Sequence, residues 1–129
     1  MPQREVELIL VRQLASYLTL PIFVVDTKGT LIFFNEPAER LLGRRFEETE
    51  ELVLDDWSAS LAPTGLDGQP LLQHQRPIVV ALEQHRPAHA RIRIRSLEGE
   101  WREVEVTAFP IVGQAGRDLG AVALFWSES

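Results

Sequence analysis

The chain has 129 residues, about the size of one domain, and its 45% hydrophobic and 25% charged residues exclude a disordered tail. It contains no cysteine, which excludes disulfides, thiolate metal sites, cysteine nucleophiles and cofactors attached through a thiol. The net charge of −6 argues against a nucleic-acid partner, because phosphate binding needs an excess of basic residues. No apolar run could span a bilayer, and Glu5 and Glu7 interrupt any signal peptide, so we expect a cytoplasmic protein without a membrane partner.

Residues 2–18 are predicted to form an amphipathic helix. At 100° per residue most of its apolar side chains fall within an arc of about 200°, wider than the stripe that docks on one surface. Such a helix could contact two surfaces, one on its own domain and one on a second copy of the chain. Alternatively, it could lie deep in the hydrophobic core of its own domain, and the sequence leaves both possibilities open. We therefore divide the chain into a dimerisation helix at 1–20 and a domain at 21–129.

After Pro21, residues 22–25 and 30–34 are apolar runs separated by a turn that contains Asp26 and Gly29, which predicts a β-hairpin with both faces covered. A short helix follows, with Asn35 or Glu36 as its cap and Gly43 at its end. Residues 44–72 are predicted to be irregular, with one or two helical turns and a turn at 67–70.

An acidic stretch lies at 47–56. We expect it to be a solvated loop or a frayed helix. The alternative is a Ca²⁺ or Mg²⁺ site, but the spacing does not match the alternating ligands of a calcium loop and the central glycine is missing. We therefore predict no metal site.

Residues 75–85 are predicted to form a helix, and residues 88–96, 101–111 and 119–126 three strands. The first of these strands alternates arginine with isoleucine, which indicates one solvent-exposed face and one buried face. Pairing Ile94 with Val104 sets Arg95 opposite Glu103 and Arg93 opposite Glu105. We therefore interpret these arginines as sheet-pairing residues and not as an anion site.

The last strand is apolar on both faces, which indicates that something packs on each side. If Val122 and Leu124 face the core, Ala121 and Ala123 lie on the back of the sheet. Small residues there would allow close approach of the amino-terminal helix. Together these elements predict an α+β fold: a five-stranded antiparallel sheet with short helices on one face and the amino-terminal helix on the other.

This order of elements, and several short motifs within it, resemble the PAS domain family, whose bacterial members are sensory and signalling modules. The resemblance covers residues 21–126 and is carried by four groups of residues. These are the strand-to-helix segment 34–43 with its Asn, Ala, Leu pair and Gly; the Asp-Gly-x-Pro turn at 66–70 with the helix start at 77–82; the hairpin turn at 98–102; and the last hairpin, with Pro110, Ile111, Gly116 and 120–122.

The resemblance implies a small ligand or cofactor, or none, between the long helix and the inner face of the sheet. It also implies a homodimer through the amino-terminal helix on the outer face, and a signalling protein as partner. Ligand binding would act by shifting the population of dimer arrangements. The candidate ligand-binding residues are Phe23, Phe34, Ile78, Leu82, His85, Ile92, Val106 and Leu124. The candidate dimer interface is Leu8, Val11, Leu14, Leu18, Ala121 and Ala123.

Departures from the family pattern narrow the choice of cofactor. Without cysteine the chain can form neither the flavin photoadduct nor the coumaric-acid attachment found in two branches of the family. A haem branch uses a histidine on the long helix, and His85, predicted to lie on the apolar face of that helix, is the candidate here. The alternative is that His85 is a residue of the last helical turn, where a cation complements the helix dipole. His85 and His89 are four residues apart, but Pro87 breaks the helix that would align them on zinc. We therefore expect no cofactor.

Two further functions stay open at this point. The first is a ligand-free module for protein–protein interaction, because protein interiors are usually close-packed. The second is an enzyme of similar architecture, which would need a base or nucleophile with a partner in a cleft. The chain has no Ser/His/Asp order, metal motif or glycine-rich phosphate loop, so we do not expect an enzyme.

Overall fold

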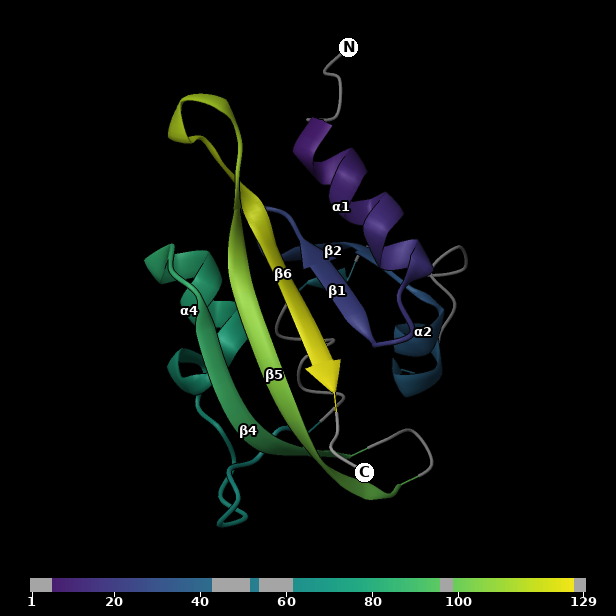
Figure 1. The fold of residues 1–129 in the computed structure, drawn as a ribbon. Coiled ribbons are helices and arrows are strands. Elements are labelled where there is room, and N and C mark those ends of the chain that lie inside the picture. Colours follow the sequence, from purple (N-terminus) through teal and green to yellow (C-terminus); the bar gives the residue numbers. More distant parts are fainter. Residues whose placement is uncertain (1–5, 43–51, 54–61, 96–98, 127–129) are drawn as a thin grey trace.

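A computed structural model describes residues 6–42, 52–53, 62–95 and 99–126. In these ranges, two helices and two strands come first, a short strand follows, and one helix and three strands come last (Figure 1). The elements are α1 (Val6–Tyr17), β1 (Ile22–Val25), β2 (Thr30–Phe34), α2 (Glu36–Leu42), β3 (Leu52–Val53), the 3₁₀ turn η2 (Gln73–Gln75), α4 (Pro77–Gln84), β4 (Ala88–Arg95), β5 (Trp101–Val112), the 3₁₀ turn η3 (Gln114–Gly116) and β6 (Asp118–Trp126).

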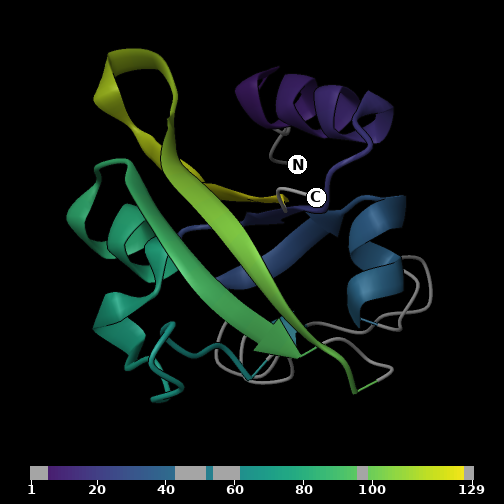
Figure 2. The ribbon, with the colours of Figure 1, turned by 60° about the horizontal axis from the view of Figure 1, so that its bottom comes forward.

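The strands form one antiparallel sheet in the order β3-β2-β1-β6-β5-β4. The five predicted strands are confirmed, and the two-residue β3 is added at the edge beside β2. The helices α4 and α1 lie on opposite sides of this sheet (Figure 2). The α+β fold class is therefore the predicted one. Within the described ranges no helix has the length and apolar character to cross a membrane.

The two faces of the sheet carry two separate hydrophobic clusters. The inner cluster lies between the sheet and the helices α2 and α4, and the outer cluster lies on the α1 side. The inner cluster contains Phe23, Val25, Leu31, Phe34, Ala38, Ile78, Val79, Ala81, Ile92, Ile94, Val104, Val106, Ala108, Ala121, Ala123 and Phe125. The outer cluster contains Ile22, Val24, Ile111, Leu119 and Val122.

Hydrogen bonds to short polar side chains stabilise the first hairpin and the start of the helix after it. The Asp26 carboxylate accepts hydrogen bonds from the backbone N–H groups of Lys28 and Thr30, both at 2.9 Å. The Asn35 side chain caps α2, accepting a hydrogen bond from the Ala38 N–H at 3.2 Å. Three predictions lie outside the described residues. They are the end of the short helix at Gly43, the irregular stretch at 44–51 and 54–61, and most of the acidic stretch within it.

The helix α4 is shorter than predicted at both ends. Arg76 precedes Pro77 and is held in an extended conformation, with φ −82° and ψ 128°, so residues 73–75 form a separate turn. The helix ends at Gln84 because His85 adopts the left-handed conformation, with φ 55°. The turn predicted at 67–70 is present, but its backbone hydrogen bonds join residues 65–69, with Gly68 at φ 85°.

The register between β4 and β5 differs from the predicted one by two residues. Arg91 lies opposite Glu105, Arg93 opposite Glu103, and Ile92 opposite Val104. A shift of two residues leaves every side chain on its own face, so the alternation of apolar and charged residues could not distinguish the two registers. The predicted exposed and buried faces of β4 are confirmed, since its arginines are exposed and its isoleucines are buried.

Candidate functional site

The inner cluster brings together most of the predicted ligand-binding residues. Phe23, Phe34, Ile78, Ile92 and Val106 are all buried members of this cluster, and they come from α4 and four strands. Leu82 on α4 is half-buried and packs against them. Six of the eight candidate residues therefore share one region of space between α4 and the sheet.

Aromatic rings occupy the centre of the inner cluster. The rings of Phe23 and Phe34 have centroids 6.2 Å apart and are stacked, whereas Phe23 and Phe125 make an edge contact at 5.3 Å. Such ring pairs add about 0.5–1.5 kcal/mol beyond the burial of their area. The chemistry of this region is apolar, so it suits the apolar part of a small molecule or a closely packed core.

The side chain of Leu124 lies on the opposite face from the predicted one. Residues directly opposite each other on paired strands share a face, and Val106 of the inner cluster lies opposite Phe125. Phe125 therefore points inward and Leu124 packs against the outer cluster. Sequence reasoning missed Phe125 because β6 is apolar on both faces, and only its pairing with β5 selects one of them.

The position of His85 also differs from the predicted one. It caps α4 instead of lying on its apolar face, and its Nδ1 atom is 3.4 Å from a carboxylate oxygen of Asp118, with both side chains about half exposed. The left-handed backbone at His85 turns the chain away from the helix axis. Within the ranges that the structure describes, no three His, Asp or Glu side chains gather in a metal-binding group.

The outer face carries α1, and this helix is anchored by only part of its apolar surface. Val11, and Leu18 just after the helix, are half-buried against the outer cluster. Leu14, also predicted for the interface, is 59% exposed, and Leu10 and Tyr17 are 57% and 83% exposed. The side chain of Leu8 lies outside the described part of the chain.

Ala121 and Ala123 do not lie under α1 as predicted. Both are fully buried members of the inner cluster, on the face that α4 covers. Small residues at these positions do permit a helix to approach the sheet, but that helix is α4, whose Ala81 is also fully buried. The outer face of β6 is instead formed by Val122 and Leu124.

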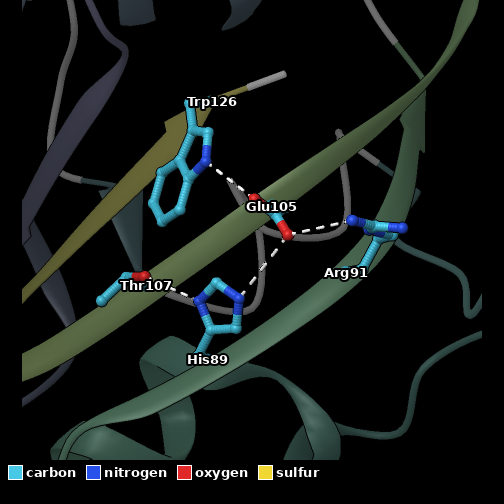
Figure 3. Close-up of polar contacts among 5 residues, drawn as sticks. All are labelled: His89, Arg91, Glu105, Thr107 and Trp126. Atoms are coloured by element: carbon cyan, nitrogen blue, oxygen red, sulfur yellow. Dashed lines mark hydrogen bonds and ion pairs between the residues drawn. The ribbon is translucent and has the colours of Figure 1, made fainter. Parts of the chain in front are cut away.

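A polar group on the outer face connects three strands through one carboxylate (Figure 3). Glu105 on β5 accepts a hydrogen bond from the Trp126 indole N–H on β6 at 2.8 Å. Its other oxygen lies 3.3 Å from an Arg91 guanidinium nitrogen and 3.8 Å from the His89 Nε2 atom, both on β4. The His89 Nδ1 atom is 2.8 Å from the Thr107 hydroxyl oxygen. We call these five residues the Glu105 group.

The Glu105 group was not foreseen as a unit. The sequence predicted pairs of arginine and glutamate across β4 and β5, but with Arg93 and not Arg91 opposite Glu105. The bond to Trp126 depends on the β5–β6 register, in which Glu105 lies directly opposite Trp126. With an 18% exposed side chain, Glu105 holds the end of β6 against its neighbours.

The family profile and the solved structures that match this chain agree with each other. The family profile described as PAS domain matches residues 19–127, and no curated protein matches the chain. Among solved structures, the PAS domain of Bordetella pertussis BvgS is similar with a TM-score of 0.65 and 16% identity, over 95% of this chain and 86% of that one.

Two further solved structures share the fold. The PAS domain of nitrogen regulation protein NR(II) from Vibrio parahaemolyticus has a TM-score of 0.63 and 16% identity, covering 92% of this chain and 98% of that one. The light-state dimer of the fungal blue-light photoreceptor Vivid has a TM-score of 0.63 and 11% identity, covering 98% and 97%. At these identities the likeness concerns the fold alone.

Proposed function

The chain belongs to the PAS domain family, whose members are generally sensory or signalling modules, and we propose that it transduces a signal as a dimer joined through α1. In this proposal the outer face and α1 form the contact between two copies. The inner cluster is where a small molecule would change the relative stability of two dimer arrangements. The output is then a change in the arrangement presented to a signalling partner.

The exposed apolar surface of α1 is the observation that carries this proposal. Ile9, Leu10, Leu14 and Tyr17 are all exposed, although Val11 on the same helix is anchored on the sheet. Apolar surface left in water on an otherwise docked helix is typical of an interaction site. A second copy offers the same surface, and two-fold pairing of identical surfaces is the commonest form of oligomer.

The chemistry of the inner cluster indicates the class of ligand. The described side chains of this cluster are aliphatic and aromatic, so the part of a ligand that contacts them should be apolar, because a charged group would lose its hydration against them. We therefore propose a small apolar molecule. It would shift the dimer arrangement only to the extent that it binds one packing of α4 on the sheet better than another.

A ligand-free interaction module is the second candidate function. The close contacts of Phe23 with Phe34 and Phe125 favour it, because a core filled by its own rings needs no ligand. In that case dimerisation itself, or association with another signalling protein, would be the activity.

The test of the dimer is the variant Leu14→Glu, compared with Ser16→Glu by light scattering. Both positions are exposed on α1 and both variants add one negative charge, but Ser16 is two residues from Leu14 and so lies on the other side of the helix, away from Leu14 and Tyr17. We expect Leu14→Glu to weaken dimerisation at least about tenfold, because burying a charge in an apolar contact is unfavourable. Ser16→Glu should leave the dimer intact.

An equal effect of the two variants would contradict the proposal, because the charge and not the apolar surface would then matter. A wild-type chain that stays monomeric at about 100 μM would contradict it directly. Both variants should keep wild-type circular dichroism, which separates dissociation from unfolding.

A further inference from the structure

One buried side-chain amide connects three segments at the end of the sheet where α1 and α2 meet. Asn35 is 3% exposed. Its Oδ1 atom accepts hydrogen bonds from the backbone N–H of Ile22 at 3.0 Å and of Ala38 at 3.2 Å. Its Nδ2 atom donates to the backbone oxygens of Leu20 at 2.7 Å and of Leu18 at 3.4 Å. The oxygen thus holds β1 and α2, while the nitrogen holds the segment that leaves α1.

These segments belong to opposite faces of the sheet. α1 ends at Tyr17, so Leu18 and Leu20 lie in its connection to β1, and Leu18 packs on the outer cluster. Ala38, in the first turn of α2, is fully buried in the inner cluster. The end of α1 and the helix α2 lie beside each other at one end of the molecule (Figures 1 and 2). Asn35 lies between them.

The Asn35 amide makes more hydrogen bonds than a helix cap requires. An aspartate or serine caps a helix about as well as asparagine, because only an accepting oxygen is needed. Two donors to backbone carbonyls need the NH₂ group, which aspartate and serine lack. The reversed orientation of the amide would set its NH₂ against two N–H groups and its oxygen against two carbonyls, so the partners determine which way it points.

We propose that Asn35 is a positioning residue that couples the docking of α1 on the outer face to the start of α2 on the inner face. This inference rests on the proposed function, in which α1 carries the dimer contact and the inner cluster carries the ligand. A movement of α1 that carries Leu18 and Leu20 with it must either break the Nδ2 bonds or move Asn35. Because Asn35 is buried, water cannot replace the broken bonds at little cost.

The coupling can be measured by amide hydrogen exchange of the full chain, followed at Ala38 and Glu39 in α2. Val11→Ala removes part of the anchor of α1 about two turns before Leu18, whose backbone oxygen Asn35 binds, and Gln13→Ala is the exposed control. We expect Val11→Ala to raise exchange at Ala38 and Glu39 at least about threefold, and Gln13→Ala to leave it unchanged.

The same comparison is then made with the Nδ2 donors removed. Asn35→Asp and Asn35→Ser each keep an accepting oxygen for α2, and the serine variant adds no buried charge. In either background, Val11→Ala should have no further effect on α2, although exchange at the end of α1 still rises. Asp26→Ala is the matched control, because Asp26 also accepts two backbone N–H bonds, at the other end of β1 and away from α1.

Two results would overturn the proposal. In the first, Val11→Ala loosens α1 and leaves α2 unchanged. In the second, its effect on α2 persists in the Asn35→Asp and Asn35→Ser backgrounds, so that the two changes are additive. Neither result depends on the oligomeric state. A failure of the proposed dimer would appear instead as a monomeric wild type in light scattering.

Discussion

Gly120 is a residue whose identity the backbone requires. It has φ 140°, and a Cβ atom built on it would collide with the backbone oxygen of Val25 on the neighbouring strand. Strand β6 can therefore pass close to the end of β1 only with glycine here. A side chain at this position combines backbone strain with a clash against atoms that cannot move independently.

We predict that Gly120→Ala lowers the free energy of unfolding by about 3 kcal/mol, the upper end for a single strained residue. The matched control is Gly116→Ala, which also has positive φ, at 72°, but whose Cβ would meet no atom within 4 Å. This control should lose only about 1 kcal/mol. Urea denaturation of both variants measures the difference, and equal losses would show that the close approach to Val25 is unimportant.

Glu105 is the second residue at which a single group holds several elements. Its ion pair with Arg91 is half exposed on the arginine side and contributes at most about 0.2–1 kcal/mol. Its bond to the Trp126 indole matters more, because Trp126 is partly buried and its N–H would otherwise lose a partner.

We predict that Glu105→Ala destabilises the domain by about 2 kcal/mol, whereas Glu105→Gln, which keeps an accepting oxygen, loses less than about 1 kcal/mol. Urea denaturation measures both, and the Trp126 indole N–H signal in NMR reports the bond directly. If both variants lose the same amount, the charge and not the hydrogen bond is the stabilising feature.

At the scale of the elements, α1 has two apolar sides with different roles. Val11 faces the outer cluster of its own domain, whereas Leu14 is exposed. The sequence left open whether the wide apolar arc serves one surface or two, and the structure assigns part of it to the sheet.

We therefore predict that Val11→Glu lowers the free energy of unfolding by about 1–3 kcal/mol, because it places a charge against the outer cluster. Leu14→Glu should leave the stability of the monomer within about 0.5 kcal/mol of wild type. Thermal unfolding of the two variants at low concentration makes the comparison. The opposite ranking would mean that the anchored side of α1 has been wrongly assigned.

Elements were predictable where one local signal dominates. The runs at 22–25 and 30–34 are bounded by Pro21 and the Asp26 turn, and both strands have the predicted limits. The β4–β5 register was not predictable, because a two-residue shift preserves each face. The end of α4 was predicted one residue too late, since the left-handed conformation of His85 depends on how the chain turns into β4.

For the candidate site residues too, the face of the sheet was predictable at some positions and not at others. Val106 was assigned correctly to the inner face because it alternates with Glu105 and Thr107. Phe23 and Phe34 also lie on that face, but their runs are apolar on both faces and the pattern alone does not select one. Leu124, Ala121 and Ala123 were assigned to the wrong faces because both alternating sets of β6 are apolar. Only the pairing of β6 with β5, a contact between distant parts of the chain, distinguishes them.

At the scale of the whole molecule, one sheet separates two apolar regions with different surroundings. The inner cluster is enclosed by α4 and α2, and the outer cluster is covered by α1, which itself keeps an exposed apolar surface. The Glu105 group joins β4, β5 and β6 on the outer face, and Asn35 lies where the segment that leaves α1 meets the start of α2. This arrangement is suited to relating events on one face to contacts on the other.

A native mass spectrum of the purified wild-type chain tests the central claim, dimerisation, most directly. The account predicts a species of about twice 14.6 kDa, and a reproducible extra mass would identify an apolar ligand in the inner cluster. A dimer without extra mass would favour the ligand-free module. A monomer of 14.6 kDa at the concentrations used for light scattering would contradict the dimer and with it the proposed function.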